Sequence, residues 1–306
     1  MMQPFRFEPI YQERIWGGTA MQDILHRSVP SACVNYGESW EISDRPDACS
    51  IVSEGPYKGK SLHELWTEHR EELFGKGFEQ FERFPLLCKI LDAKENLSLQ
   101  VHPPECTAKK LGGEVKNEIW YVMNSLPDSL IYSGIKGSAT SDEIRQKAEA
   151  GTLDQILNAT HLNKGEALYI PSGLVHAIGA GHLIAEIQQN SDTTYRLYDW
   201  GRTDDQGNPR ELHLDQAITS IEEFNILAQD QNYLSDMPHF RTKVVKINKG
   251  ESWKSENPEK FAIIVILEGA LKLDHDLANM GDFLLAPAHS CSLEASSDTT
   301  LIVATM

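Results

Sequence analysis

The stretch GEALYIPSGLVH, residues Gly165–His176, holds a strand-length apolar segment between a glycine and a proline. A second copy of this spacing occurs in GDFLLAP, residues Gly281–Pro287. An apolar strand pattern precedes each copy, EIWYVMNS in the first case and AIIVILEG in the second. The first copy has a longer connection, which a helical pattern near Ser141–Asn158 accounts for. A β-unit that occurs twice, with one copy enlarged, predicts two jelly rolls in tandem.

Most of the remaining chain also consists of strand patterns between turn residues, as in FPLLCKIL, NLSLQVH and HLIAEIQQ. Many short strands at close spacing are typical of all-β sandwiches and barrels. Four helical segments are expected beside them. They are Ser61–Phe74, with a capping box from Ser61 and Glu64; a short helical turn in PPECTAKKLGG, Pro103–Gly113; Ser141–Asn158, capped by Ser141 or Asp142; and Asp215–Phe224.

The expected fold is therefore mainly β, with two tandem jelly rolls and a few helices inserted in or beside the first. We predict a first unit with the helical insertions over residues 1–236 and a C-terminal unit over residues 237–306. In this prediction, strands from the N-terminal part of the chain can also belong to the second unit. The segment DMPHF, Asp236–Phe240, is the expected link between the two units.

Charge and cysteine content limit the partners and the compartment. The chain has 306 residues, a formal net charge of −17 and a pI of about 5.0, which argues against nucleic acid and against anionic membranes as partners. No apolar leader and no membrane-length apolar run occurs. Five cysteines without a CxxC pair predict reduced thiols and a cytoplasmic protein.

A candidate metal site begins in SLQVHPPE, residues Ser98–Glu105. Gln100 and His102 occupy alternate positions of a strand, so both side chains point to the same face. Glu118 begins the next strand, and His176 follows the proline–glycine turn of the opening stretch. Two imidazoles, a carboxylate and an amide oxygen suit Zn²⁺ with an open position for substrate. We predict one zinc ion per chain at this site.

Each ligand candidate also has a simpler explanation. A single histidine on a strand usually packs or faces solvent. Glu118 and Lys116 are close enough in sequence to form a surface ion pair, and Gln100 can bond to the backbone. The combination of all four residue types is what favours a metal.

The same residues carry a family resemblance. The pattern G-x5-P-x-G-x2-H of Gly165–His176 resembles the second motif of the cupin superfamily, and QVH with Glu118 resembles the first, with glutamine in place of a histidine. Over most of its length the chain is similar to the type I mannose-6-phosphate isomerase (phosphomannose isomerase) family in its short bacterial form. The matching pieces are IWGG, GESWEIS, FPLLCKILDAKENLSLQVHP, KNEIWYV and IPSGLVHAIGAGHLIAEIQQNSDTTYRLYDWGR.

This resemblance implies a zinc-dependent isomerase acting on a small sugar phosphate. Residue by residue, the family's metal ligands fall on Gln100, His102, Glu118 and His176. Its active-site arginine falls on Arg196, and Ser98 and Lys116 line the sugar-phosphate cleft. Lys89 and Arg202 are further cations within the matching motifs and, with Lys116 and Arg196, candidates to bind the phosphate.

The reaction implied is the interconversion of mannose 6-phosphate and fructose 6-phosphate through a metal-stabilised enediol(ate). A divalent cation polarises the carbonyl, and Arg196 adds a fixed positive charge. Lys116 and Glu186 are both candidates for the acid/base group, with a lowered pKa expected for a lysine beside zinc. The alternatives are a solvent-facing Glu186 and an ion pair of Arg196 with Asp192 or Asp199.

Two other functions remain open from the residues alone. A non-catalytic sugar-phosphate-binding cupin would keep the metal without acid/base chemistry. An iron-dependent cupin oxygenase is disfavoured because Gln100 and Glu118 accompany only two histidines. The second copy has serine at position 292, where the first has His176, and His289 in place of Gly173, so we expect no metal there.

Overall fold

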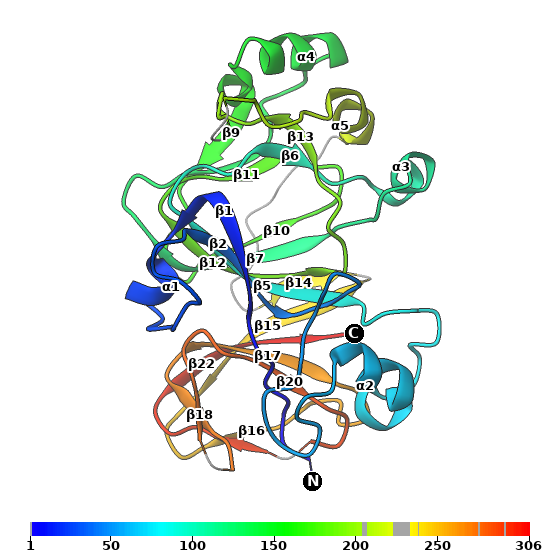
Figure 1. The fold of residues 1–306 in the computed structure, drawn as a ribbon, viewed down its shortest axis with the longest axis vertical. Helices are drawn as coiled ribbons and strands as arrows, with labels where there is room; N and C mark the ends of the chain where they lie inside the picture. The colour runs from blue at the N-terminus through cyan, green and yellow to red at the C-terminus, as the bar shows by residue number, and fades with distance from the viewer. Residues whose placement is uncertain (1, 204–206, 223–232, 238, 275, 291) are drawn as a thin grey trace.

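The two sequence copies form equivalent parts of two large antiparallel sheets in the computed structural model, which describes the chain except residues 1, 204–206, 223–232, 238, 275 and 291 (Figure 1). The six-stranded sheet has the order β1 (Ile10–Gly18), β2 (Tyr36–Ile42), β5 (Leu86–Ala93), β12 (His182–Gln189), β7 (Glu118–Ser125), β10 (Ala167–Ile170). The five-stranded sheet has the order β14 (Tyr233–Met237), β15 (Phe240–Ile247), β22 (Thr299–Thr305), β17 (Ala262–Glu268), β20 (Phe283–Ala286). Strands β2 to β10 of the first sheet match the five of the second in order.

The glycine of each copy makes the same backbone hydrogen bond. The N–H of Gly165 donates to the carbonyl of Val122 at 2.9 Å, and the N–H of Gly281 donates to that of Ile266 at 2.8 Å. Their φ angles are 93° and 91°, a conformation that glycine adopts without a steric penalty. Counting back four residues from Val122 and Ile266 makes Ala262 the counterpart of Glu118. Strand order and this hydrogen bond therefore recur in both copies, as the internal repeat predicts, whereas the assignment of the two units as tandem jelly rolls stays a prediction.

Each large sheet is completed by smaller sheets that enclose an apolar core. In the first unit the second sheet has the order β13 (Tyr195–Tyr198), β6 (Leu99–Val101), β11 (His176–Ile178), β8 (Ile131–Ile135), β9 (Leu157–Thr160). The second unit has two two-stranded sheets, β16 (Ser252–Trp253) with β21 (Leu293–Glu294) and β18 (Ala270–Lys272) with β19 (Leu277–Asn279). A short pair, β3 (Asp44–Arg45) and β4 (Ala48–Cys49), lies beside the first unit. The mainly β prediction is confirmed.

The two units pack through the outer faces of their large sheets. Because strand residues alternate between faces, Ile119 and Tyr121 of β7 point away from the first unit's interior and join Ile263 and Val265 of β17 in one buried cluster. The predicted capping box of Ser61 and Glu64 starts α2 (Leu62–Glu68), and α2 adds Trp66 to this cluster. The π-helix η1 (Arg70–Phe74) follows α2. This packing leaves the inner face of the six-stranded sheet to form the site.

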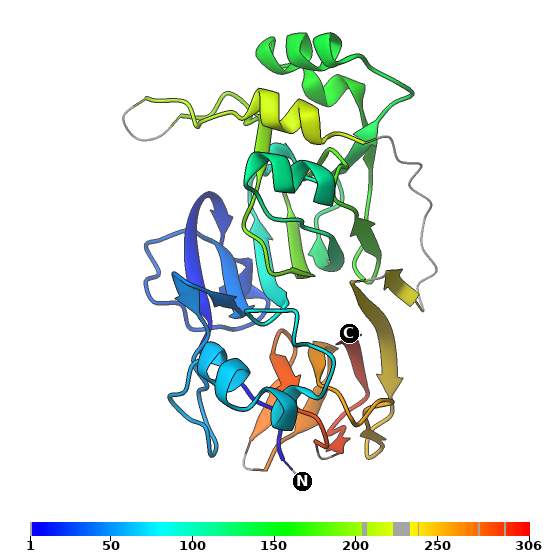
Figure 2. The ribbon, with the colours of Figure 1, turned by 90° about the vertical axis from the view of Figure 1, so that its right-hand side faces the viewer.

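The remaining helices lie around the first unit (Figure 2). They are α1 (Ala20–Asp23), α3 (Glu105–Leu111), α4 (Ser141–Glu149) and α5 (Leu214–Ser220). Two details of the expected helices are wrong. Thr140, not Ser141 or Asp142, caps α4, because its side chain accepts the N–H of Glu143. The helical pattern also ends early: a 3₁₀ turn η2 (Leu153–Ile156) leads into β9, so Asn158 lies in a strand. The end of Asp215–Phe224 falls outside the described residues.

The segment expected to link the units is part of a sheet. Asp236 and Met237 belong to β14, which pairs with β15 starting at Phe240. The N-terminal segment also reaches the second unit, where Phe5 exchanges backbone hydrogen bonds with Leu285 at 2.8 and 3.0 Å. The division at residues 236 and 237 stays a prediction, and the pairing of β14 with β15 favours a boundary ahead of Tyr233.

None of the helices in the described part of the chain has the length and hydrophobicity of a membrane span.

Candidate metal centre

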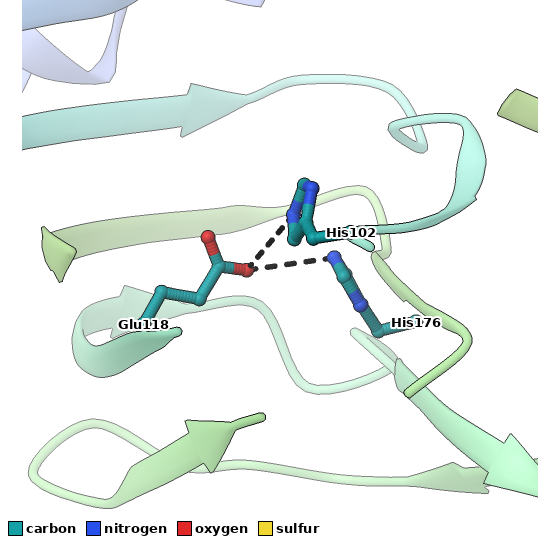
Figure 3. Close-up of side chains that lie close together, drawn as sticks. All are labelled: His102, Glu118 and His176. Atoms are coloured by element: carbon teal, nitrogen blue, oxygen red, sulfur yellow. Dashed lines mark ion pairs between the residues drawn. The ribbon is translucent and has the colours of Figure 1, made fainter. Parts of the chain in front are cut away.

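Strand register brings the predicted site residues together on one inner face. Gln100 of β6 lies directly opposite His176 of β11 on one side and Arg196 of β13 on the other. Directly opposed residues project to the same face of a sheet, so these three side chains form a row. His102 follows β6, and Glu118 reaches the row from β7 of the facing sheet (Figure 3).

The three strongest ligand candidates converge within metal-binding range. Glu118 Oε1 lies 3.7 Å from His102 Nε2 and 3.4 Å from His176 Nε2. All three side chains are fully buried, and their ligand atoms lie within 4.8 Å of one another. Gln100, the expected fourth ligand, lies beside them, with its amide nitrogen 3.3 Å from His176 Nε2 and its oxygen accepting from Ser98 Oγ at 3.2 Å. A half-turn of this amide exchanges its oxygen and nitrogen and would turn the oxygen toward the cluster.

Both imidazoles are held with the same nitrogen facing the cluster. His102 Nδ1 lies 2.9 Å from the carbonyl of Thr193, and His176 Nδ1 lies 2.8 Å from that of Leu174. Each Nδ1 therefore carries the proton, and each Nε2 directs its lone pair into the cluster, as a metal-ligating histidine requires. Burial lowers the pKa of His102, and burial with the neighbouring His102 lowers the pKa of His176 to about 3. Both rings are neutral at neutral pH.

The cluster also contains polar atoms with no hydrogen-bond partner in the described part of the chain. His102 Nε2 and Glu118 Oε1 are buried without one, whereas Glu118 Oε2 is held in an ion pair with Lys116. Buried polar atoms are almost always satisfied, so an imidazole nitrogen and a carboxylate oxygen that face each other without a proton donor between them indicate a site that binds a cation. The pKa of Glu118 is lowered, because Lys116 and the two histidines outweigh the effect of burial. An ionised carboxylate, two neutral imidazoles and an amide oxygen fit a divalent metal ion.

The two acid/base candidates lie beside the cluster and beside each other. Lys116 Nζ is 2.5 Å from Glu118 Oε2 and 3.6 Å from Glu186 Oε1. Burial disfavours the Lys116 ammonium, but Glu118 and Glu186 outweigh it and raise its pKa. The protein's own charges therefore keep Lys116 protonated, and the lowered pKa expected beside a zinc ion stays a prediction. Burial raises the pKa of Glu186 to about 7, against the opposing effect of Lys116, and its 2% exposure excludes the solvent-facing alternative.

Arg196 has no ion-pair partner within the residues that the structure describes. The expected alternative, a pair with Asp192 or Asp199, is absent there, because Asp199 is bound by Arg202 and lies 3.4 Å from Arg210. Arg196 Nε is buried without a hydrogen-bond acceptor, and burial together with Arg210 lowers the pKa of the guanidinium. An unpaired cation in the row with Gln100 is available to an anionic ligand.

Sequence reasoning missed a second charged row on the same inner face. Lys89 of β5 lies opposite both Glu186 and Trp40, and its ammonium is 3.2 Å from Glu38 Oε2 and 4.6 Å from the centre of the Trp40 ring. Lys89 is therefore a paired, buried cation and not a free contact for phosphate. The pattern GESWEIS carried the signal, since Glu38 and Trp40 alternate toward this face.

The second unit has no comparable cluster in its described residues. Across the described chain, His102, Glu118 and His176 form the only group of three or more His, Cys, Asp or Glu side chains close enough to share a metal ion. Ala262 replaces Glu118, and Ser292 occupies the position of His176. His289, the counterpart of Gly173, keeps a positive φ of 56° beside 91° for the glycine. The turn is therefore retained where the ligands are not.

These features define the class of protein: a mainly β, cupin-type protein with a candidate metal site inside the first of two related units. A family model described as phosphomannose isomerase type I, catalytic domain, matches residues 4–124. The chain is 40% identical over 280 residues to mannose-6-phosphate isomerase ManA of Bacillus subtilis (strain 168), covering 87% of this chain and 86% of that protein. It is 35% identical over 317 residues to a mannose-6-phosphate isomerase of Streptococcus mutans serotype c, covering 99% and 98%.

Solved structures agree with the sequence relatives. The crystal structure of the mannose 6-phosphate isomerase from Bacillus subtilis superposes with a TM-score of 0.87 at 34% identity and covers 100% of both chains. An apo phosphomannose isomerase from Salmonella typhimurium reaches a TM-score of 0.76 at 15% identity over 99% of both chains, which shows a shared fold. The chain belongs to the type I phosphomannose isomerase family.

Proposed function

We propose that this protein interconverts mannose 6-phosphate and fructose 6-phosphate. The observation that carries the proposal is the buried cluster of His102, Glu118 and His176, in which His102 Nε2 and Glu118 Oε1 have no hydrogen-bond partner, with Lys116 and Glu186 directly beside it. The relatives named above are mannose-6-phosphate isomerases, and family membership supports the same reaction here. The substrate is a small sugar phosphate.

We propose Zn²⁺ as the metal, held by Gln100, His102, Glu118 and His176. Two imidazole nitrogens, one carboxylate and one amide oxygen support this choice over Mg²⁺ or Ca²⁺, which prefer all-oxygen sites. When bound, the ion acts as a Lewis acid toward the sugar carbonyl and offsets the charge of the enediol(ate). The protein's own contribution is a set of pre-oriented, desolvated ligands.

Glu186 is the proposed group that moves the proton between C1 and C2. Its Oε1 is buried without a hydrogen-bond partner, whereas its Oε2 accepts a hydrogen bond. Lys116 carries its proton and lies between the carboxylates of Glu118 and Glu186, so it has no lone pair to offer. A carboxylate whose pKa is near 7 is well matched to general base catalysis. Lys116 then holds the two carboxylates in place and donates to the substrate.

Arg196 and Ser98 complete the proposed substrate contacts. The unpaired guanidinium of Arg196 stabilises negative charge that develops on the sugar oxygens, a contribution of about 3 kcal/mol for one such donor. Ser98 is buried beside Gln100 and offers its hydroxyl to the substrate or to the ligand amide. We place the activity in the cytoplasm, which the free thiols of Cys33, Cys49, Cys88 and Cys106 support.

The test combines metal analysis, a coupled assay for fructose 6-phosphate and exchange of the substrate C2 proton in D₂O, all on one preparation. We expect about one zinc per chain, turnover, and deuterium incorporation. Glu186→Gln should keep the metal and lose turnover and exchange together, by roughly 10²–10⁴-fold. Metal and ligand binding without exchange in the wild-type protein would instead identify a non-catalytic sugar-phosphate-binding cupin.

A further inference from the structure

Trp120 connects the proposed base to a metal ligand. It lies on β7 two residues after Glu118, so its side chain points to the same inner face, and it is 1% exposed. Its indole N–H donates to Glu186 Oε2 at 3.0 Å. Its ring meets the imidazole of His176 edge-on, with the ring centres 5.4 Å apart and an interplanar angle of 74°. The side chain of Trp120 thus contacts both the proposed base, Glu186, and a proposed metal ligand, His176.

The contact to Glu186 fixes the direction of the carboxylate. Trp120 and Glu186 are directly opposite in the β7–β12 ladder, so the hydrogen bond joins two rigid neighbouring strands. The indole occupies Oε2, and this leaves Oε1 as the oxygen without a hydrogen-bond partner, on the side of Lys116. A carboxylate held at one oxygen cannot rotate freely, so its other oxygen stays in one place.

Packing alone does not explain this arrangement. Trp120 belongs to an apolar cluster with Trp16, Leu91 and Ile184, and a phenylalanine would also fill such a core. An indole in this position requires a hydrogen-bond acceptor when buried, and the chain provides the carboxylate of Glu186. The bond is stronger when the acceptor carboxylate is ionised, which is the form a general base needs, so it favours that form as well as orienting it.

We infer that Trp120 is a positioning residue that orients the Glu186 carboxylate for proton transfer and supports the ring of the ligand His176. The inference rests on the proposed function, because it takes Glu186 as the base. It adds a residue that acts through Glu186 without touching the substrate.

The test removes the indole N–H and keeps the ring. We expect Trp120→Phe to lower kcat about tenfold, the value of one hydrogen bond to a charged group, with KM and metal content unchanged. On a Glu186→Gln background the same change should have no further effect, since Trp120 acts through that carboxylate. Trp66→Phe is the matched control: Trp66 is equally buried but donates to the carbonyl of Phe81, outside the site.

The possible outcomes distinguish an error in the role of Trp120 from an error in the assignment of Glu186 as the base. Normal kcat in Trp120→Phe, or equal losses in the wild-type and Glu186→Gln backgrounds, would overturn the role of Trp120 and leave the proposed function standing. Full activity of Glu186→Gln would overturn the assignment of the base itself. If Trp120→Phe does not fold, benzothienylalanine at position 120 keeps the shape of indole and removes only the N–H, and the same kcat loss is expected.

Discussion

Replacing Arg196 with methionine should separate activity from stability. Arg196 lies in the row with Gln100 and has no ion-pair partner among the described side chains, and its Nε is buried without an acceptor. Removing it therefore leaves no carboxylate unpaired, unlike the loss of Arg202, which binds Asp199. Burial and repulsion from Arg210 both disfavour the charged guanidinium. We expect the free energy of unfolding of Arg196→Met to be unchanged or higher than that of the wild type.

Activity should change in the opposite direction. If Arg196 stabilises the charge that develops on the sugar oxygens, its loss costs about 3 kcal/mol of barrier, or roughly 100-fold in kcat. The metal content should stay at the wild-type level, because Arg196 is not a ligand. Steady-state kinetics, metal analysis and urea unfolding on the same protein measure all three quantities.

Arg145→Met is the control for this experiment. Arg145 is a half-exposed arginine of α4 paired with Asp215, and a surface pair contributes under about 1 kcal/mol. Its turnover should match the wild type. The reasoning about Arg196 is refuted if Arg196→Met keeps near-normal kcat, or if it loses stability and metal together with activity.

Three further outcomes are expected. His102→Ala should lose bound metal and turnover in parallel in metal analysis and the coupled assay, whereas the exposed His161→Ala should keep both. The wild-type kcat should fall about tenfold per pH unit below about pH 7, because protonation of Glu186 removes the base; a profile flat down to pH 5.5 would contradict this. Burial raises the pKa of Asp92 from 3.8 to about 6, so its folded form loses stability as the pH rises through that range. The advantage of Asp92→Asn in unfolding free energy should grow by up to about 3 kcal/mol from pH 4 to pH 7 in urea titrations; a pH-independent difference would exclude the assignment.

The sequence alone was enough for the features that depend on short-range spacing. Alternation places Gln100 and His102 on one face, and the matched glycine–proline spacing at Gly165 and Gly281 implies a duplicated unit. Both are properties of a single strand or turn, so they can be predicted without knowing which strands pair with each other. The candidate ligands Glu118 and His176 were also found from motif spacing, and the structure places these side chains with His102 in one cluster.

The tertiary structure decided the features that depend on which strands are neighbours. The charge state of Lys116 follows from the two carboxylates within 3.6 Å, one of which comes from a strand far along the chain. The burial of Glu186, its bond to Trp120 and the pairing of β14 with β15 have the same origin. Periodicity tells which face a residue points to, but the distance between two charges, and therefore their pKa values and roles, is set only when register brings separate strands together.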